Sequence, residues 1–396
     1  MPASLATVDA ILKEVYGPRI ESQLQNECVG PKRIERTSEG VTSNVGGKYV
    51  DFPIKIKRNS GIGYRAEGGQ LPAAGQQGYA EVHVPLRYGY GRVRYTGQLM
   101  ELAQTNTQAF TSAVEAENEG LKDDLVKDSS RIFYGDGTGL MATLADTATS
   151  ATHVVDNAQW ISEGDVVDVL VKSTGSATGG LTATEVQSVN YATNTVVFGS
   201  SFTAASTQGV YRSGSWGQEP SGLGNIINAT STLHTVNPST VSKWKSTIAA
   251  NSGTPRALTE ALMIRLADDI RVQGGKTSVI FTSLGVRRSY FNLLTQQRRY
   301  TDTKEYAGGF KGLPFNYGTE IPVVEDVDHA PGSMHFVDEK KIKIYRSKEW
   351  HWMDDDGHVL KWVTNYDSWE ALLRQYSEMG TSQRNAHGAL VDLTES

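Results

Sequence analysis

The chain has 396 residues, a formal net charge of −6 and 21% charged residues. A chain of this length can form two or three domains, each with its own core. It has no basic tail or Lys/Arg block, so the sequence does not predict a tight electrostatic grip on nucleic acid. Cys28 is the only cysteine, which excludes a disulfide framework or a cysteine-based zinc site within one chain.

The N-terminal part of the sequence carries no targeting signal that we recognise. It lacks a basic start followed by an apolar run, and nowhere do eighteen apolar residues follow one another. We therefore expect no signal peptide and no membrane span. Residues 6–25 contain Val8, Ile11, Leu12 and Val15 at helical spacing, which predicts a short amphipathic helix.

Residues 38–98 predict a long hairpin. The runs YVDFPIKIKR and AEVHVPLRYGYGRVRYTG alternate as strands do, and NSGIGYRAEGGQLPAAGQQG between them is rich in Gly and Gln with few core candidates. Connections of that length are uncommon inside compact domains. At this point two interpretations of the hairpin remain: a flexible surface loop, and an arm that packs on another subunit.

The clearest helix is predicted for residues 103–134. Its apolar residues recur on one face, at Phe110, Val114, Leu121, Leu125 and Ile132. Acidic residues dominate its earlier half and basic residues its later half, which complements the helix dipole. At 1.5 Å per residue such a helix would be a rod of roughly 45 Å.

A glycine-rich turn, GDGTGL, follows this helix and contains Gly135, Gly137 and Gly139. Phosphate-binding loops place their glycines before a helix, where backbone amides face the anion. Here the glycines come after the helix, whose C-terminal end carries partial negative charge. We therefore expect a helix-end turn in which Gly135 adopts the left-handed conformation and ends the helix.

Residues 144–216 have few charges, and short strand-like runs alternate with turn signals. This pattern predicts a small all-β domain. Its flanks, GDGTGL and SGLGNII, look like the two ends of one turn that the domain has split. Trp160, Tyr191 and Tyr211 are its main candidates for stacking on a sugar ring.

The rest of the chain predicts a mixed α/β region. LTEALMIRLADDIRVQGG and LGVRRSYFNLLTQQRRY have helical spacing, and TSVIFTS, IPVVED, SMHFVD and KIKIYRS are typical of strands. An Asp-Gly pair at 356–357 between two alternating runs predicts a hairpin. Four tryptophans at 350–369 indicate packing between two layers.

The sequence contains no specific motif for catalysis or for binding a metal or a cofactor. GGKTS at 274–278 lacks the first glycine of a phosphate loop and precedes a strand-like run. DDDGH at 354–358 fits a solvated turn better than a calcium loop. No H-E-x-x-H or G-x-S-x-G motif occurs. We therefore predict no catalytic, metal-binding or cofactor-binding residue, no cofactor, and no enzyme activity.

The order of parts resembles the major capsid protein family of tailed bacteriophages, whose fold was first seen in Hong Kong 97. The resemblance rests on RIFYGDGTGL after the long helix, SGLGNII, FKGLPFNYGTEIPVVEDV and SMHFVDEKKIKIYRS, and it covers nearly the whole chain except 144–216. It implies an α+β fold of the Hong Kong 97 type with an inserted small all-β domain.

The resemblance also implies a division of the chain. Its parts are an N-terminal arm 1–37, an extended loop with peripheral-domain strands 38–98, a spine helix 99–143, the β insert 144–216, a mainly axial domain 217–346, and a return to the peripheral domain 347–396. The extended loop would lie over a neighbouring subunit. Its contact candidates are Lys57, Arg58, Tyr64, Arg65 and Glu67.

The function implied is a self-assembling head protein of a tailed double-stranded DNA phage, located in the virion and assembled in the host bacterial cytoplasm. Its partners would be copies of itself in hexamers and pentamers, a portal, and DNA contacted without sequence specificity. Only some forty residues precede the first arm strand, which implies a separate scaffolding protein; a decoration protein is left open. Some relatives cross-link Lys to Asn between subunits. Lys55, Lys57 and Asn365 are available for such a bond here, but nothing in the sequence singles them out.

Two alternative functions remain at this stage. An encapsulin-like shell would use the same fold around a cargo enzyme. A glycan-binding protein would use the β domain as its binding part.

Overall fold

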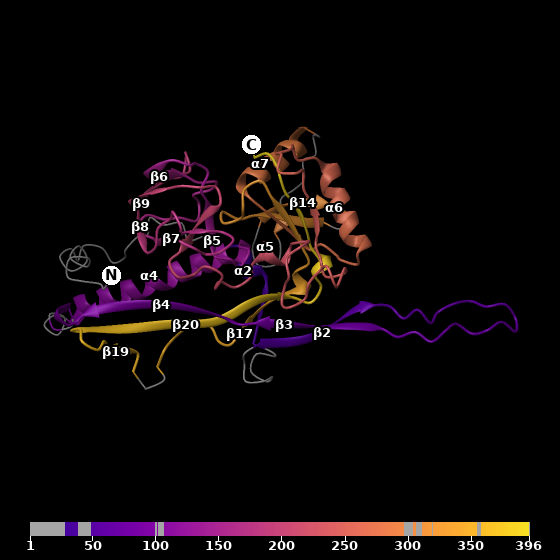
Figure 1. Ribbon diagram of the computed structural model, residues 1–396, viewed down its shortest axis with the longest axis horizontal. Helices are drawn as coiled ribbons and strands as arrows, with labels where there is room; N and C mark the ends of the chain where they lie inside the picture. Colours follow the sequence, from indigo (N-terminus) through magenta and orange to yellow (C-terminus); the bar gives the residue numbers. More distant parts are fainter. Residues whose placement is uncertain are drawn as a thin grey trace.

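The computed structural model describes residues 28–38, 49–99, 101, 107–296, 304–305, 311–318, 320–354 and 358–395. The helix expected at 6–25 and the Asp-Gly turn expected at 356–357 lie outside these residues. The described chain forms a long flat base, two domains that stand on the same side of it, and an arm that projects from one end (Figure 1).

The arm is an antiparallel pair of strands, β2 (Tyr49–Lys57) and β3 (Gly78–Pro85). Their connection carries the projecting tip, drawn at the right in Figure 1. The structure thus confirms a long hairpin between two strand-like runs. At its base, Val50, Val82 and Val84 are buried in the largest core cluster, so the arm is anchored at one end only.

The base is a six-stranded sheet built around one long strand, β20 (Ser368–Thr381). Its other strands are β4 (Arg87–Thr96), β17 (Ile342–Arg346), β1 (Glu35–Thr37), β18 (His351–Trp352) and β19 (Leu360–Trp362). Helix α4 (Thr107–Tyr134) lies along β4, where Leu121 and Leu125 contact Gly91. The helix predicted at 103–134 is thus present from Thr107, and Leu121 and Leu125 of the predicted apolar face lie against the base.

The region predicted to be a small all-β domain forms a closed sheet. Its six strands run in the order β5 (Leu140–Thr143), β10 (Gln208–Arg212), β7 (Val166–Val171), β8 (Thr184–Asn190), β9 (Thr195–Thr203) and β6 (Thr149–Val154). A bridge between Leu144 and Val155 joins the two ends of this order, so the sheet closes on itself. Closure removes the exposed edges that an open sheet would present. We call residues 140–212 the barrel.

The second domain is a seven-stranded sheet with two helices on one face. Its strands run in the order β11 (Thr247–Ala249), β21 (Gly388–Leu390), β16 (Met334–Val337), β12 (Val279–Thr282), β15 (Glu320–Glu325), β14 (Lys311–Asn316) and β13 (Lys304–Glu305). Helices α6 (Glu260–Val272) and α7 (Leu284–Gln296) share a core cluster with Ile280 and Phe336.

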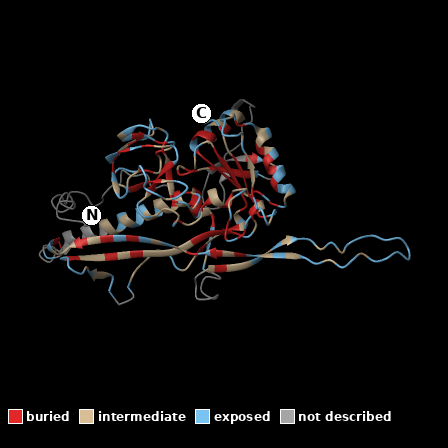
Figure 2. Ribbon diagram, viewed as in Figure 1, coloured by how far each residue is buried: buried red, intermediate tan, exposed pale blue. Residues whose placement is uncertain are grey.

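The other face of this sheet packs on the base. Val279 and Phe281 of β12 belong to the core cluster that contains Phe133 and Tyr134 at the end of α4. Helix α5 (Leu223–Ile226) and the short helix α2 (Gly30–Arg33) complete this layer. Because both faces are covered, every residue of β12 is buried (Figure 2).

Two expectations about the C-terminal part were wrong. The strands β18 and β19 both pair with β20, rather than with each other as a hairpin. The last described segment does not stay with the base, because β21 joins the seven-stranded sheet beside β16 and β11. The long strand β20 is the antiparallel partner of both short strands, so their backbone groups are paired without contact between them.

Candidate assembly surfaces

The tip of the arm exposes several large apolar side chains close together. Tyr64 is 100% exposed, and Ile62 and Leu71 are more than 80% exposed. The tip is held by contacts within itself: Arg65 Nε donates to the carbonyl of Gln70 at 2.9 Å, and Gly69 N donates to the carbonyl of Ala66 at 2.9 Å. The tip is thus ordered by its own hydrogen bonds, and its apolar side chains lie in water in the single chain.

All five predicted contact residues lie on this arm and are exposed. Lys57 ends β2, and Arg58, Tyr64, Arg65 and Glu67 follow in the tip. Sequence reasoning missed Ile62, Leu71 and Tyr79, which are the other large apolar side chains exposed along the arm. Their apolar character was visible in the sequence, but a run without periodicity does not tell exposed apolar residues from buried ones.

The glycine-rich turn directly precedes β5, the first strand of the barrel. The helix α4 ends at Tyr134, as expected, but the prediction that Gly135 is left-handed was wrong: the positive φ angles occur at Gly137 (+80°) and Gly139 (+83°). Gly135 closes a tighter turn, in which its N–H donates to the carbonyl of Ile132 at 3.0 Å.

The two flanks of the barrel lie side by side. Gly217 N donates to the carbonyl of Thr138 at 2.7 Å, and Gly224 N donates to the carbonyl of Gly135 at 3.1 Å. Residues that precede the barrel in the sequence are therefore hydrogen-bonded to residues that follow it. This geometry is the one expected if the barrel occupies a turn that would otherwise join α4 directly to α5.

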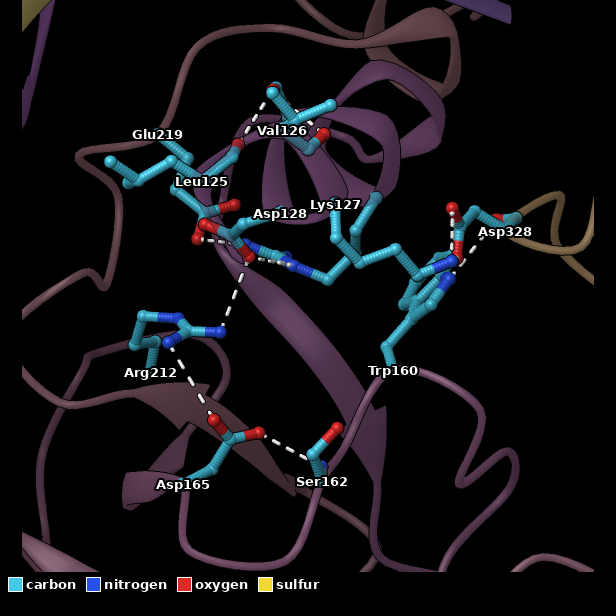
Figure 3. A network of polar contacts seen from close by, with 12 residues as sticks. Leu125, Val126, Lys127, Asp128, Trp160, Ser162, Asp165, Arg212, Glu219 and Asp328 are labelled. Carbon is cyan, nitrogen blue, oxygen red and sulfur yellow. Dashed lines mark hydrogen bonds and ion pairs between the residues drawn. The ribbon is translucent and has the colours of Figure 1, made fainter. Parts of the chain in front are cut away.

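A polar network fixes the barrel on α4 (Figure 3). Arg212 of β10 approaches Asp128 of α4 at 3.4 Å and Asp165 of the barrel at 3.7 Å. Asp128 also accepts from Arg131 at 2.9 Å, and Arg131 reaches Glu219 at 2.5 Å. Burial raises the pKa of the Asp128 carboxyl, but Arg131 and Arg212 outweigh this and hold its pKa below the usual range.

The loop between β15 and β16 is a second junction. Lys127 of α4 donates to both carboxylate oxygens of Asp328 at 2.8 Å, and Trp160 of the barrel donates to the carbonyl of Asp328 at 3.0 Å. Asp326 accepts from the hydroxyl of Tyr134 at 2.8 Å and from the N–H of Gly30 at 2.9 Å. Base, barrel and α/β domain are thus tied together at one loop.

A cavity of about 680 Å³ opens between α4, β4, β20 and the segment that follows the barrel. Glu378 of β20 lines it; burial raises the pKa of this carboxyl to about 8, despite hydrogen bonds from the N–H of Ser221 and Met379. Arg87 lies 3.9 Å away. The cavity walls mix apolar side chains with charged ones, some of which are paired across the domains, as Arg212 is with Asp128.

Asp51, Glu81 and His83 lie within 4.8 Å of one another at the base of the arm. His83 Nδ1 faces Asp51 at 2.5 Å, whereas its Nε2 faces Glu81 at 4.0 Å. Each carboxylate therefore meets a different ring nitrogen. Only the contact between His83 and Asp51 is within hydrogen-bonding distance, because Glu81 lies 4.0 Å from the other ring nitrogen.

The candidates for sugar stacking do not come together. Trp160 is turned toward the α/β domain by its bond to Asp328, and Tyr211 is only 1% exposed. Tyr191 is exposed but donates its hydroxyl to the carbonyl of Ile161. The segment GGKTS leads into strand β12 and not into a helix, so it lacks the geometry of a phosphate loop.

A two-stranded projecting arm, a long helix along a flat sheet, and an α/β domain above it define the fold of a phage shell subunit. Among solved structures, a chain of the cyanophage A-1(L) capsid is 15% identical, with a TM-score of 0.56 over 96% of this chain and 98% of that chain. A chain of Mycobacterium phage Bobi is 9% identical, with a TM-score of 0.48 over 99% of each chain. An encapsulin of Synechococcus elongatus is 6% identical, with a TM-score of 0.44 over 99% of this chain and 96% of that chain.

The family follows from the sequence comparison. The sequence model described as SU10 major capsid protein matches residues 91–357, which is more than half of the chain. The chain therefore belongs to the SU10 major capsid protein family, and it is a structural capsid protein of a virion, not an enzyme. No curated protein sequence matches the chain. Within the described residues, no helix is long and apolar enough to cross a membrane.

Proposed function

We propose that this major capsid protein assembles as hexamers and pentamers into the icosahedral shell of a tailed double-stranded DNA phage, in the cytoplasm of its bacterial host. The observation that carries this proposal is the arm. It projects away from the rest of the described chain and exposes Ile62, Tyr64 and Leu71 at its tip (Figure 1). Burial of such side chains on a neighbour is favourable by about 25 cal/mol per Å² of apolar surface.

The arm provides two kinds of contact to a neighbour. Its apolar tip residues supply buried area, and Lys57, Arg58, Arg65 and Glu67 supply charges that set the register of docking. Each contact is weak by itself. A closed shell makes the same contact many times, so the assembly is stable although single contacts remain reversible.

The domains take the roles that the shell requires. The base sheet with α4 acts as the peripheral domain, and the seven-stranded sheet with α6 and α7 acts as the axial domain at the centre of each capsomer. The barrel is an insertion that decorates or staples the shell. A separate scaffolding protein and a portal complete the assembly, and double-stranded DNA is contacted without sequence specificity.

Electron microscopy and mass photometry of the purified full chain test the proposal. We expect hollow megadalton particles from the wild type. The triple variant Ile62→Ser, Tyr64→Ser and Leu71→Ser should fold but remain unassembled, whereas Val154→Ser, which removes an exposed apolar side chain from the barrel, should still assemble. A discrete wild-type monomer under every condition, including with the other virion proteins, contradicts the proposal.

A further inference from the structure

The cavity between α4, β4 and β20 has apolar side chains in its walls that the described residues do not cover. Leu125 and Ile132 of α4, Ile344 of β17 and Trp350 line it and are half-buried, and Val126 of α4 is 46% exposed. Its volume of about 680 Å³ lies within the range of binding pockets. Covering such a wall with another apolar surface is favourable.

The described part of the chain begins in the wall of this cavity. Cys28 and Pro31 line it, and the thiol of Cys28 donates to the carbonyl of Val126 at 3.6 Å. The N–H groups of Val29 and Gly30 both donate to the carboxylate of Asp326, which fixes the chain at this point. Residues 1–27, which we call the N-terminal segment, therefore continue from the cavity wall itself.

The sequence of the N-terminal segment suits a cover for an apolar wall. Val8, Ile11, Leu12 and Val15 recur at helical spacing, so a helix here carries one apolar face. Gly17-Pro18 directly afterwards is a turn signal. Residues 17–27 can extend over up to about 40 Å. This length allows the helical part to return to the cavity that Cys28 lines.

The charges of the cavity complement those of the segment. Burial raises the pKa of Glu378 to about 8, so this carboxyl is neutral at pH 7. Among the described residues Arg87 has no other acidic partner, and Arg36 donates to the carbonyl of Pro31. The charged side chains of the segment are mostly carboxylates: Asp9, Glu14, Glu21 and Glu27 against Lys13 and Arg19. Two guanidinium groups of the cavity wall thus meet an acidic segment.

We propose that the N-terminal segment docks the apolar face of residues 6–16 into the cavity of its own chain. The face covers Leu125, Val126 and Ile132, and the carboxylates of the segment lie toward Arg36 and Arg87. The interface belongs to the single chain, so it does not depend on the proposed shell function. It holds the segment on the base, where α4, β20 and the residues that follow the barrel meet.

Trypsin digestion of the full-length, unassembled chain tests this docking, because Lys13 and Arg19 are cleavage sites within the segment. A protease cleaves a docked segment only when it opens. We expect Val126→Asp, which places a charge in the cavity wall, to speed cleavage at both sites at least about fivefold. The matched control Val154→Asp changes a valine of similar exposure, 42%, on the barrel and should be cleaved as the wild type is.

A second variant leaves the described fold untouched. Ile11→Ser/Leu12→Ser changes the segment alone and should speed cleavage to the same extent as Val126→Asp, while urea denaturation reports whether Val126→Asp still folds. Equal cleavage rates for the wild type and the segment variant overturn the proposal.

Disulfide formation identifies the chain that supplies the segment. Cys28→Ser removes the single native thiol. In this background Val126→Cys is combined with Val8→Cys, Ile11→Cys or Val15→Cys in turn, and the pairs are oxidised with copper phenanthroline. We expect at least one pair to link within a single chain, and the same three positions combined with Val154→Cys to remain unlinked. No link to Val126→Cys overturns the proposal, and links that join two chains also overturn it, because a second copy then fills the cavity.

Discussion

Arg212 of the barrel lies between two carboxylates, 3.4 Å from Asp128 on α4 and 3.7 Å from Asp165 of its own domain (Figure 3). The barrel has a core cluster of its own, which meets the largest cluster through Trp160, so its position on the base depends on few apolar contacts and on polar ones such as these. Asp128 is the central group, because Arg131 and Arg212 both reach the same carboxylate oxygen.

Asp128→Asn should lower the free energy of unfolding at pH 7 by about 1–3 kcal/mol, since it removes the carboxylate that two guanidinium groups share and leaves Arg131 with Glu219 and Arg212 with Asp165. The folded pKa of Asp128 is depressed, so its contribution is present above the unfolded value near 3.8 and is lost as pH falls through the folded pKa. Urea denaturation at pH 7 and at pH 3 measures this, with the exposed Asp123→Asn on the same helix as control. Equal destabilisation by both variants contradicts the assignment.

Gly139→Ala should destabilise the fold by about 1–3 kcal/mol, whereas Gly135→Ala should cost less than about 1 kcal/mol. Gly139 has φ +83°, and a Cβ there would meet the carbonyl oxygen of Ser215 at 2.9 Å. Gly135 has no positive φ, and its Cβ would lie 3.3 Å from the nearest atom. Thermal unfolding of the two variants compares them directly, and the reverse order of stability is the result that contradicts this reading.

Glu378→Gln should stabilise the protein at pH 9, by up to about 4 kcal/mol, and have little effect at pH 5. Burial raises the folded pKa of Glu378 to about 8. The fold therefore holds a proton that the unfolded chain releases near pH 4.5, and stability falls as pH rises from there through pH 8. Unfolding free energies of wild type and variant at both pH values check this. If the substitution leaves the pH dependence of the unfolding free energy unchanged, Glu378 is not the cause of that dependence.

Arg384→Met should lower the free energy of unfolding by about 3–5 kcal/mol. The Arg384 guanidinium is fully buried and donates to the carbonyls of Ile226 at 3.0 Å, Ser231 at 2.6 Å and Asn225 at 2.8 Å. Its removal takes a donor from each of these three carbonyl oxygens, of which that of Ile226 still accepts from the hydroxyl of Ser246.

Arg384→Lys is the matched control for this position. It keeps the charge but cannot reproduce the planar set of donors, so we expect it to be intermediate in urea denaturation. An Arg384→Met variant as stable as the wild type would show that water replaces the lost donors.

Periodic patterns predicted the local elements well. The helical face of α6, with Leu266 and Ile270 buried, and its end shortly before Gly274, which has φ +93°, follow from residues close in sequence. The arm was predictable for the same reason, because its two strands are joined by one connection. The resemblance to phage capsid proteins rested on the order of such elements, and the family match confirms it.

Long-range partners were not predictable. The alternating runs of β18 and β19 fit a local hairpin equally well, and only the presence of β20 beside them decides their pairing. The arm-tip candidates were chosen for charge and aromatic type, and their role at a neighbour stays a prediction. Arg92 and Glu370 form an ion pair at 3.0 Å although they lie far apart in the sequence, and they come together only through strand register.

The sequence by itself determined the identity and order of the elements, since helix and strand periodicity, glycine turns and exposed composition act over a few residues. The tertiary structure decided which strands pair, where the barrel is fixed, and which glycines take the left-handed conformation. Those outcomes depend on contacts such as Arg212 with Asp128 and Gly139 with Ser215. Such contacts join residues distant in sequence, and their free energy exists only once the chain has folded.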